Sequence, residues 1–73
     1  MISMLWFDNS KEPLTKKIER AAAYYQDKYA KVTRSVVVNP LDLEPCDLPG
    51  VTVHPSGECL RHHLLVSEET VGS

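Results

Sequence analysis

The sequence has few of the residues that mark secreted, disulfide-stabilised or membrane proteins. Its two cysteines are too few for the disulfide framework of a small secreted domain, so reduced thiols are expected, with a single Cys46–Cys59 bridge as the alternative. The first residues, MISMLWFDN, have no basic segment, and their apolar run is too short for a signal peptide or a membrane span. Without an export or anchoring signal, the sequence predicts a cytoplasmic protein with no membrane contact.

No internal repeat, low-complexity tract or linker divides the chain, which indicates one domain. At 73 residues this domain is near the size at which a single core is only just sufficient. Its apolar fraction of 42% is ordinary for a globular chain and argues against disorder throughout.

The net charge of −2 conceals an uneven distribution. Residues 11–34 contain seven basic and three acidic residues, a balance of +4, whereas residues 35–73 contain one basic and six acidic residues, a balance of −5. Asp8 supplies the remaining negative charge. The chain is therefore polarised, with a basic first half and an acidic second half.

The longest periodic stretch covers residues 13–30, PLTKKIERAAAYYQDKYA, and predicts one amphipathic helix. Pro13 suits the first helical turn, and Glu12 is expected at the N-cap because a residue before proline avoids the helical region. At the helical period the apolar side chains form one stripe: Leu14, Ile18, Ala21, Ala22, Tyr25 and Tyr29.

Four apolar segments predict strands, at residues 2–7, 32–39, 50–54 and 59–66. The first two are joined tightly through the helix, which favours a right-handed crossover with the two strands parallel. The last two flank Pro55-Ser56-Gly57-Glu58 and predict a hairpin with His54 opposite Cys59. One face of this hairpin would carry Val51, Val53, Leu60, His62, Leu64 and Val66, and the other Thr52, His54, Cys59, Arg61, His63 and Leu65.

These elements predict an α+β fold in the order β-α-β-β-β, with one amphipathic helix packed on a mixed sheet of three or four strands. The hairpin is placed on either side of the parallel pair, and the sequence leaves this strand order open. The domain is expected to cover residues 1–66, followed by a flexible acidic tail over residues 67–73.

The first two strands carry apolar side chains on both faces, although a single helix covers only one face. Fully burying a large apolar side chain is worth roughly 1.5–3 kcal/mol, and a bare second face would expose an adhesive patch. Self-association as a homodimer, or docking in a larger complex, would bury this face, with Leu5, Phe7 and Val37 as the contact residues. The alternative is that the proline-rich segment 41–50 folds over it.

Three features resemble short uncharacterised bacterial proteins: the helical stretch AAAYYQDKY, the segment Val36-Val37-Val38-Asn39-Pro40 and a final strand that contains His63. The likeness spans most of the chain, and its motifs are structural rather than chemical. The resemblance implies a small stand-alone module. It implies no activity, cofactor or substrate.

Cysteines and histidines in the second half suggest a metal site, but strand geometry removes most candidates. His62 and His63 would point to opposite faces of one strand, and Cys59 and His63 would lie about 13 Å apart along it. The remaining weak candidates are His54, Cys59 and Cys46, whose spacing matches no strong zinc pattern. No cofactor is predicted.

The pair of His54 and Cys59 would also suit a thiolate–imidazole nucleophile. The sequence offers no recognisable acid to orient the histidine and no oxyanion-hole loop. A domain of 8.2 kDa also has little depth for a substrate pocket. The sequence therefore predicts that the protein is not an enzyme.

Basic residues of the helix suggest nucleic-acid binding as a second function. Lys16, Lys17 and Arg20 would lie on the solvent side, where phosphate contacts form. The pI of about 5.8 and the lack of a recognition motif argue against this function. The other use of the charge polarity is assembly, in which the basic helix meets the acidic loop or tail of a neighbouring molecule.

The leading hypothesis is thus a small, non-enzymatic, cytoplasmic interaction module that acts as a homo-oligomer or as an accessory subunit. Nucleic-acid binding through the helix is the second hypothesis. Metal binding through the histidine and the two cysteines is the third.

Overall fold

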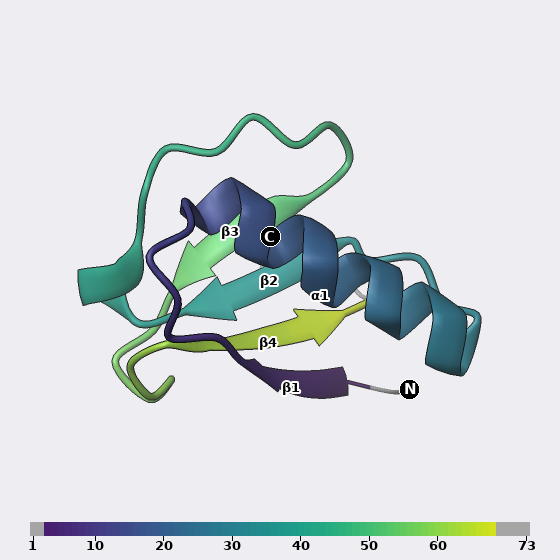
Figure 1. Ribbon diagram of the computed structural model, residues 1–73, viewed down its shortest axis with the longest axis horizontal. Helices are drawn as coiled ribbons and strands as arrows, with labels where there is room; N and C mark the ends of the chain where they lie inside the picture. The colour runs from purple at the N-terminus through teal and green to yellow at the C-terminus, as the bar shows by residue number, and fades with distance from the viewer. Residues whose placement is uncertain (1–2, 69–73) are drawn as a thin grey trace.

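Four strands and one helix make up residues 3–68, the part of the chain that the computed structural model describes (Figure 1). Their order along the chain confirms the predicted β-α-β-β-β arrangement and the α+β fold class. The elements are β1 (Ser3–Phe7), α1 (Leu14–Tyr29), β2 (Ser35–Val38), the short 3-10 helix η1 (Pro40–Asp42), β3 (Thr52–Pro55) and β4 (His63–Ser67).

The strands form one mixed sheet in the order β1-β4-β2-β3. The last strand, β4, lies antiparallel between β1 and β2, so these two strands point the same way without touching, whereas β2 and β3 are direct parallel neighbours. The predicted hairpin of β3 with β4 is therefore wrong. Residues 59–62 do not continue the strand, because His62 adopts a left-handed backbone conformation with φ 65°.

For the residues that do lie in strands, the register nevertheless sends the side chains to the predicted faces. Val36 and Val53 are register partners, and Val36 also lies opposite Val66 of β4, so these three share the face that contacts the helix. Val37 lies opposite Leu65 of β4, on the other face. The alternation was predictable because side chains along a strand have a period of two whatever its partner is.

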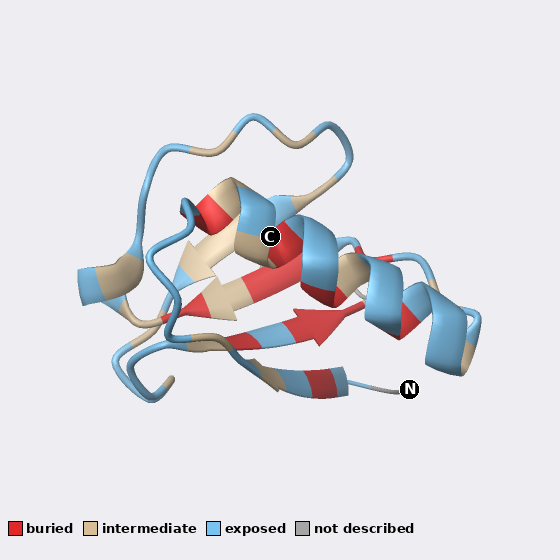
Figure 2. Ribbon diagram, viewed as in Figure 1, coloured by how far each residue is buried: buried red, intermediate tan, exposed pale blue. Residues whose placement is uncertain are grey.

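One side of α1 and one face of the sheet together form the core, as the helical stripe predicted. Buried residues fall on α1 and on the two inner strands, while β1 and β3 are mostly exposed or half-buried (Figure 2). The buried apolar residues are Met4, Leu14, Ile18, Ala21, Tyr25, Val36, Val38, Leu64 and Val66.

The segment from η1 to β3 lies on the same side of the sheet as the helix. Cys46 and Leu48 pack against the core there, and the Glu44 carboxylate accepts a hydrogen bond from the backbone N–H of Leu14 at 3.1 Å. This distant carboxylate takes the place of the predicted local cap at Glu12, since the N-cap residue is Pro13. The alternative in which segment 41–50 covers the second face of the sheet is also wrong.

The C-terminal tail was predicted to begin at residue 67, which is too early. Ser67 is the last residue of β4 and is buried, so the domain extends past residue 66. The rest of the predicted tail, residues 69–73, lies outside the described residues, as does Ile2 of the predicted first strand.

Candidate functional site

The face of the sheet opposite α1 carries an apolar surface that no described helix covers. Leu5 and Phe7 of β1 are 60% and 58% exposed, Leu65 of β4 is 37% exposed, and Val37 of β2 is half-buried. The three residues predicted as contacts thus lie on one face, and Leu65 joins them. We call this set of four residues the open face. Every second residue of each strand points to this side of the sheet, and none of these residues is Asp, Glu, Lys or Arg. They are Ser3, Leu5, Phe7, Ser35, Val37, Thr52, His54, His63, Leu65 and Ser67.

An apolar groove of about 340 Å³ lies at one end of the open face. Strands β1, β2 and β4 contribute one part of its lining, and the turn between β3 and β4 contributes the rest. The lining residues are Leu5, Val37, Leu65, Ser56, Glu58, Cys59 and Leu60. Sequence reasoning missed the role of Leu65, although a leucine at an outward position of a strand is a signal of an apolar surface. The prediction that Leu60 shares a face with Val53 is wrong, because Leu60 lies in the turn before β4, where it is 66% exposed and lines the groove.

Hydrogen bonds from outside the turn hold the wall of the groove in place. The Asn39 side-chain Nδ2 donates to the carbonyl of Cys59 at 2.8 Å. The Asp42 carboxylate accepts from the backbone N–H of His62 at 2.7 Å and from Arg61 Nε at 2.8 Å. Partial burial alone would raise the pKa of Asp42, but these hydrogen bonds and the Arg61 charge bring it below its ordinary value.

The Cys59 thiol faces backbone carbonyls rather than a histidine. Its Sγ lies 3.5 Å from the Val37 carbonyl oxygen and 3.4 Å from that of His63. Burial, together with the negative charge of Asp42, raises the pKa of this thiol above its ordinary value, which favours the protonated form. The strand register places His54 opposite Val37 instead of Cys59, so the hairpin contact that suggested a thiolate–imidazole pair is not formed.

The third hypothesis, a metal site at His54, Cys59 and Cys46, does not fit the structure. Within residues 3–68 no three side chains of His, Cys, Asp or Glu come together in a way that would hold a metal ion. Cys46 lies on the helix side of the sheet, where its thiol donates to the Glu44 carbonyl at 3.4 Å. Both cysteines are free thiols.

The basic surface of α1 is exposed, as predicted. Lys16 and Arg20 are exposed and Lys17 is half-buried, and Arg20 lies 3.5 Å from the Glu12 carboxylate. Tyr24, the aromatic side chain beside this surface, packs against Trp6 with ring centroids 5.3 Å apart. A tyrosine in this contact offers less ring surface for stacking on a nucleobase than a free one.

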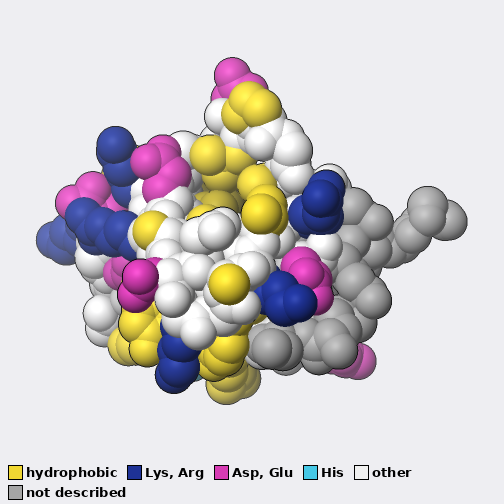
Figure 3. Space-filling model, turned by 90° about the vertical axis from the view of Figure 1, so that its right-hand side faces the viewer, with side chains coloured by type: hydrophobic (Ala, Val, Ile, Leu, Met, Phe, Trp, Pro, Cys, Tyr) yellow, Lys and Arg dark blue, Asp and Glu magenta, His cyan; other side chains and the backbone are white. Residues whose placement is uncertain are grey.

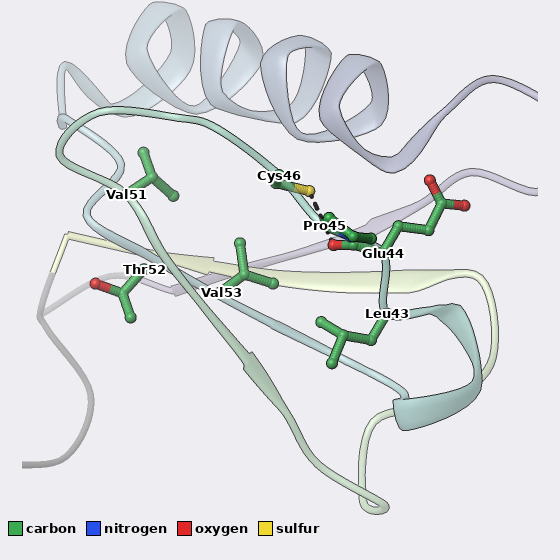
Figure 4. A pocket seen from close by; sticks show the side chains of 7 residues that line it. All are labelled: Leu43, Glu44, Pro45, Cys46, Val51, Thr52 and Val53. Atoms are coloured by element: carbon green, nitrogen blue, oxygen red, sulfur yellow. Dashed lines mark hydrogen bonds between the residues drawn. The ribbon is translucent and has the colours of Figure 1, made fainter.

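Two further cavities lie on the helix side. The larger, of about 540 Å³, is an open trough between residues 43–46 and the start of β3, with Val51 and Val53 directed to the loop and Thr52 directed away (Figure 4). Seen from the end of the molecule where the helix ends, hydrophobic side chains gather below this projecting loop, with charged side chains around them (Figure 3). The smaller cavity, about 210 Å³ at the start of α1, is lined by side chains of both charges, including the Arg61–Asp42 pair.

Comparison with protein-family models, with curated protein sequences and with solved structures finds no match to this chain. The resemblance to short bacterial proteins therefore stays a prediction. None of the helices in the described part of the chain has the length and apolar character needed to cross a membrane. The open face with its groove is the candidate functional site, because it combines exposed apolar side chains with a preformed concavity.

Proposed function

We propose that the protein is a small, non-enzymatic interaction module of the cytoplasm that forms a homodimer through the open face. The observation that supports this proposal is the exposure of Leu5 and Phe7 on a sheet face that neither the helix nor the proline-rich segment covers. Exposed apolar side chains that adjoin one another mark interaction sites more often than scattered ones do.

The exposed apolar area limits how strong such a dimer can be. Four side chains around the groove, Leu5, Phe7, Leu60 and Leu65, are each between 37% and 66% exposed. A fully buried large apolar side chain is worth roughly 1.5–3 kcal/mol, so covering the exposed fraction of all four in both copies would contribute roughly 7–13 kcal/mol. Association itself costs roughly 4–15 kcal/mol and offsets most of this gain, so we expect a weak dimer that dissociates on dilution.

The absence of charge at the strand positions of this side favours a second copy as the partner. A two-fold interface brings each residue close to residues of the same surface, so like charges would repel across it. The charged residues of α1, including Lys16, Lys17 and Arg20, lie on the far side of the molecule from the open face. Two copies therefore meet face to face without placing these charges together.

The test is the molar mass of the protein over a concentration series, measured by light scattering after size exclusion or by sedimentation equilibrium. The wild-type chain is expected to change from monomer to dimer between low and high micromolar concentration. Leu5→Lys should weaken the dimer by at least tenfold, because the new charge would be desolvated in the interface. Leu41→Lys is the matched control, since Leu41 is 76% exposed on η1, away from the open face.

A wild-type protein that stays monomeric at high micromolar concentration would overturn the proposal. So would a dimer that Leu41→Lys disrupts and Leu5→Lys leaves intact. Circular dichroism of both variants shows whether each keeps the wild-type fold, and both substitutions lie at exposed positions where the fold tolerates a lysine.

A further inference from the structure

We propose that the apolar groove is the socket for the Phe7 side chain of a second copy of this chain. This inference rests on the proposed homodimer, and it specifies the side chain that enters the groove. In a two-fold pair the contact occurs twice, since each copy would offer one Phe7 and one groove.

The groove suits one large apolar side chain. Its volume of about 340 Å³ is at the small end of the range for ligand pockets. Leu5, Val37, Leu60 and Leu65 supply most of its lining, and Glu58 is its one charged residue. Small-molecule sites also need polar groups that orient the ligand. Here the Ser56 hydroxyl accepts the Glu58 backbone N–H at 3.3 Å and the Cys59 thiol faces two carbonyls, so both of these polar groups already have partners within the chain.

Phe7 is the side chain of the open face that best fits such a socket. It is 58% exposed at the end of β1, two residues from Leu5, which lines the groove. Its ring lies 5.0 Å from the His63 ring, and this contact restricts where the side chain points. An aromatic anchor that is ordered before binding loses little conformational freedom when it enters a pocket.

The groove is also preformed, which lowers the entropic cost of filling it. Its wall is fixed to β2 and to the segment after it: the Ser56 N–H donates to the Val38 carbonyl at 2.8 Å, and Asn39 holds the Cys59 carbonyl. Two ordered partners, an anchor and a socket, therefore lie on one largely apolar face of the same molecule. A second copy supplies both at once, whereas an unrelated partner would have to match both separately.

The two cysteines provide a direct readout, because one lines the groove and the other lies across the sheet. We would alkylate the protein with a maleimide reagent over a concentration series and follow each thiol by peptide mass spectrometry. The Cys59 alkylation rate should fall at least threefold from low to high micromolar protein, as Phe7 of the second copy fills the groove. The Cys46 rate should stay constant, since Cys46 lies on the helix side.

Two variants make the test specific. Phe7→Ala should weaken the dimer at least tenfold and abolish the concentration dependence at Cys59. Leu60→Ala, which removes the 66% exposed leucine of the groove wall, should weaken it several-fold. Leu41→Ala is the control, because it removes a leucine that is 76% exposed on another surface. Thermal melting of each variant at low concentration separates a loss of association from a loss of the fold.

The outcomes separate this inference from the proposed function. A wild-type monomer at all concentrations overturns both. A wild-type dimer that persists in Phe7→Ala, or one in which Cys59 is alkylated at a constant rate, overturns the socket and leaves the dimer standing. Loss of the dimer in Phe7→Ala and Leu60→Ala, with Cys59 protected only in the wild-type dimer, supports the socket.

Discussion

The same strands form both faces of the sheet, but one face is buried and the other is exposed. On the covered face, Val36 and Val66 are fully buried beneath α1. On the open face their chain neighbours Val37 and Leu65 remain partly exposed. Because both faces carry apolar residues, the strand sequences alone do not say which side is the core. The position of α1 decides it, and the other side is the surface for which we propose association.

The sharpest test of this difference is a pair of identical substitutions at adjacent positions of β2. Val36→Ala should lower the free energy of unfolding by roughly 2–3 kcal/mol, because it opens a cavity in the core. Val37→Ala should lower the free energy of unfolding of the monomer by less than half as much. Both substitutions replace valine by alanine in the same strand, so the loss of strand propensity is the same and the difference reports on burial. Urea unfolding at low protein concentration measures both values. Equal costs would show that the two faces do not differ as described.

A smaller effect on stability is expected at Asp42, which forms hydrogen bonds with the turn that makes the wall of the groove. Asp42→Asn should destabilise the fold by roughly 1–2 kcal/mol at pH 7, because hydrogen bonds from His62 and Arg61 to a charged carboxylate are lost. The pKa of Asp42 is lowered from 3.8 in the folded state, so its stabilisation is present above about pH 3.8 and is lost as the pH falls through the folded value. Thermal melting from pH 7 to pH 3 should therefore show a shallower acid-side decline in Asp42→Asn than in wild type. An unchanged slope would contradict this role.

The smallest effect concerns the loop on the covered side. Glu44→Ala should destabilise the protein by about 1 kcal/mol, because the N–H of Leu14 at the start of α1 loses its carboxylate partner. Glu44→Gln keeps an oxygen acceptor at the same reach and should retain most of the stability. Chemical unfolding of the two variants distinguishes them, and equal losses would show that the hydrogen bond to Leu14 contributes little.

Local periodicity was enough to predict the helix, the facing of the strand residues and the apolar surface at Leu5, Phe7 and Val37. These features depend on side-chain spacing within one element. The partners of β3 and β4 could not be predicted in the same way, because pairing depends on the whole chain and two closely spaced strands favour a hairpin on local grounds. In the structure β2 lies between those two strands, and the residues just before β4 form a turn in which His62 has a left-handed backbone and donates its N–H to Asp42.

The groove and the cap on α1 were beyond local reasoning for a related reason. The residues that line the groove come from three strands and a turn, and the cap joins Leu14 to a side chain 30 positions away. No spacing rule links such positions. A polar residue in a loop, such as Glu44, is a signal only once the path of the loop is known.

The central place of β4 constrains when the protein folds during its synthesis. This strand is the last described element of the chain, yet it alone joins β1 to β2. A nascent chain that has passed α1 and β2 but has not released residues 63–67 from the ribosome cannot form the inner ladders. We therefore expect the sheet to form in one step, only after residues 63–67 have left the ribosome and β4 can insert between β1 and β2.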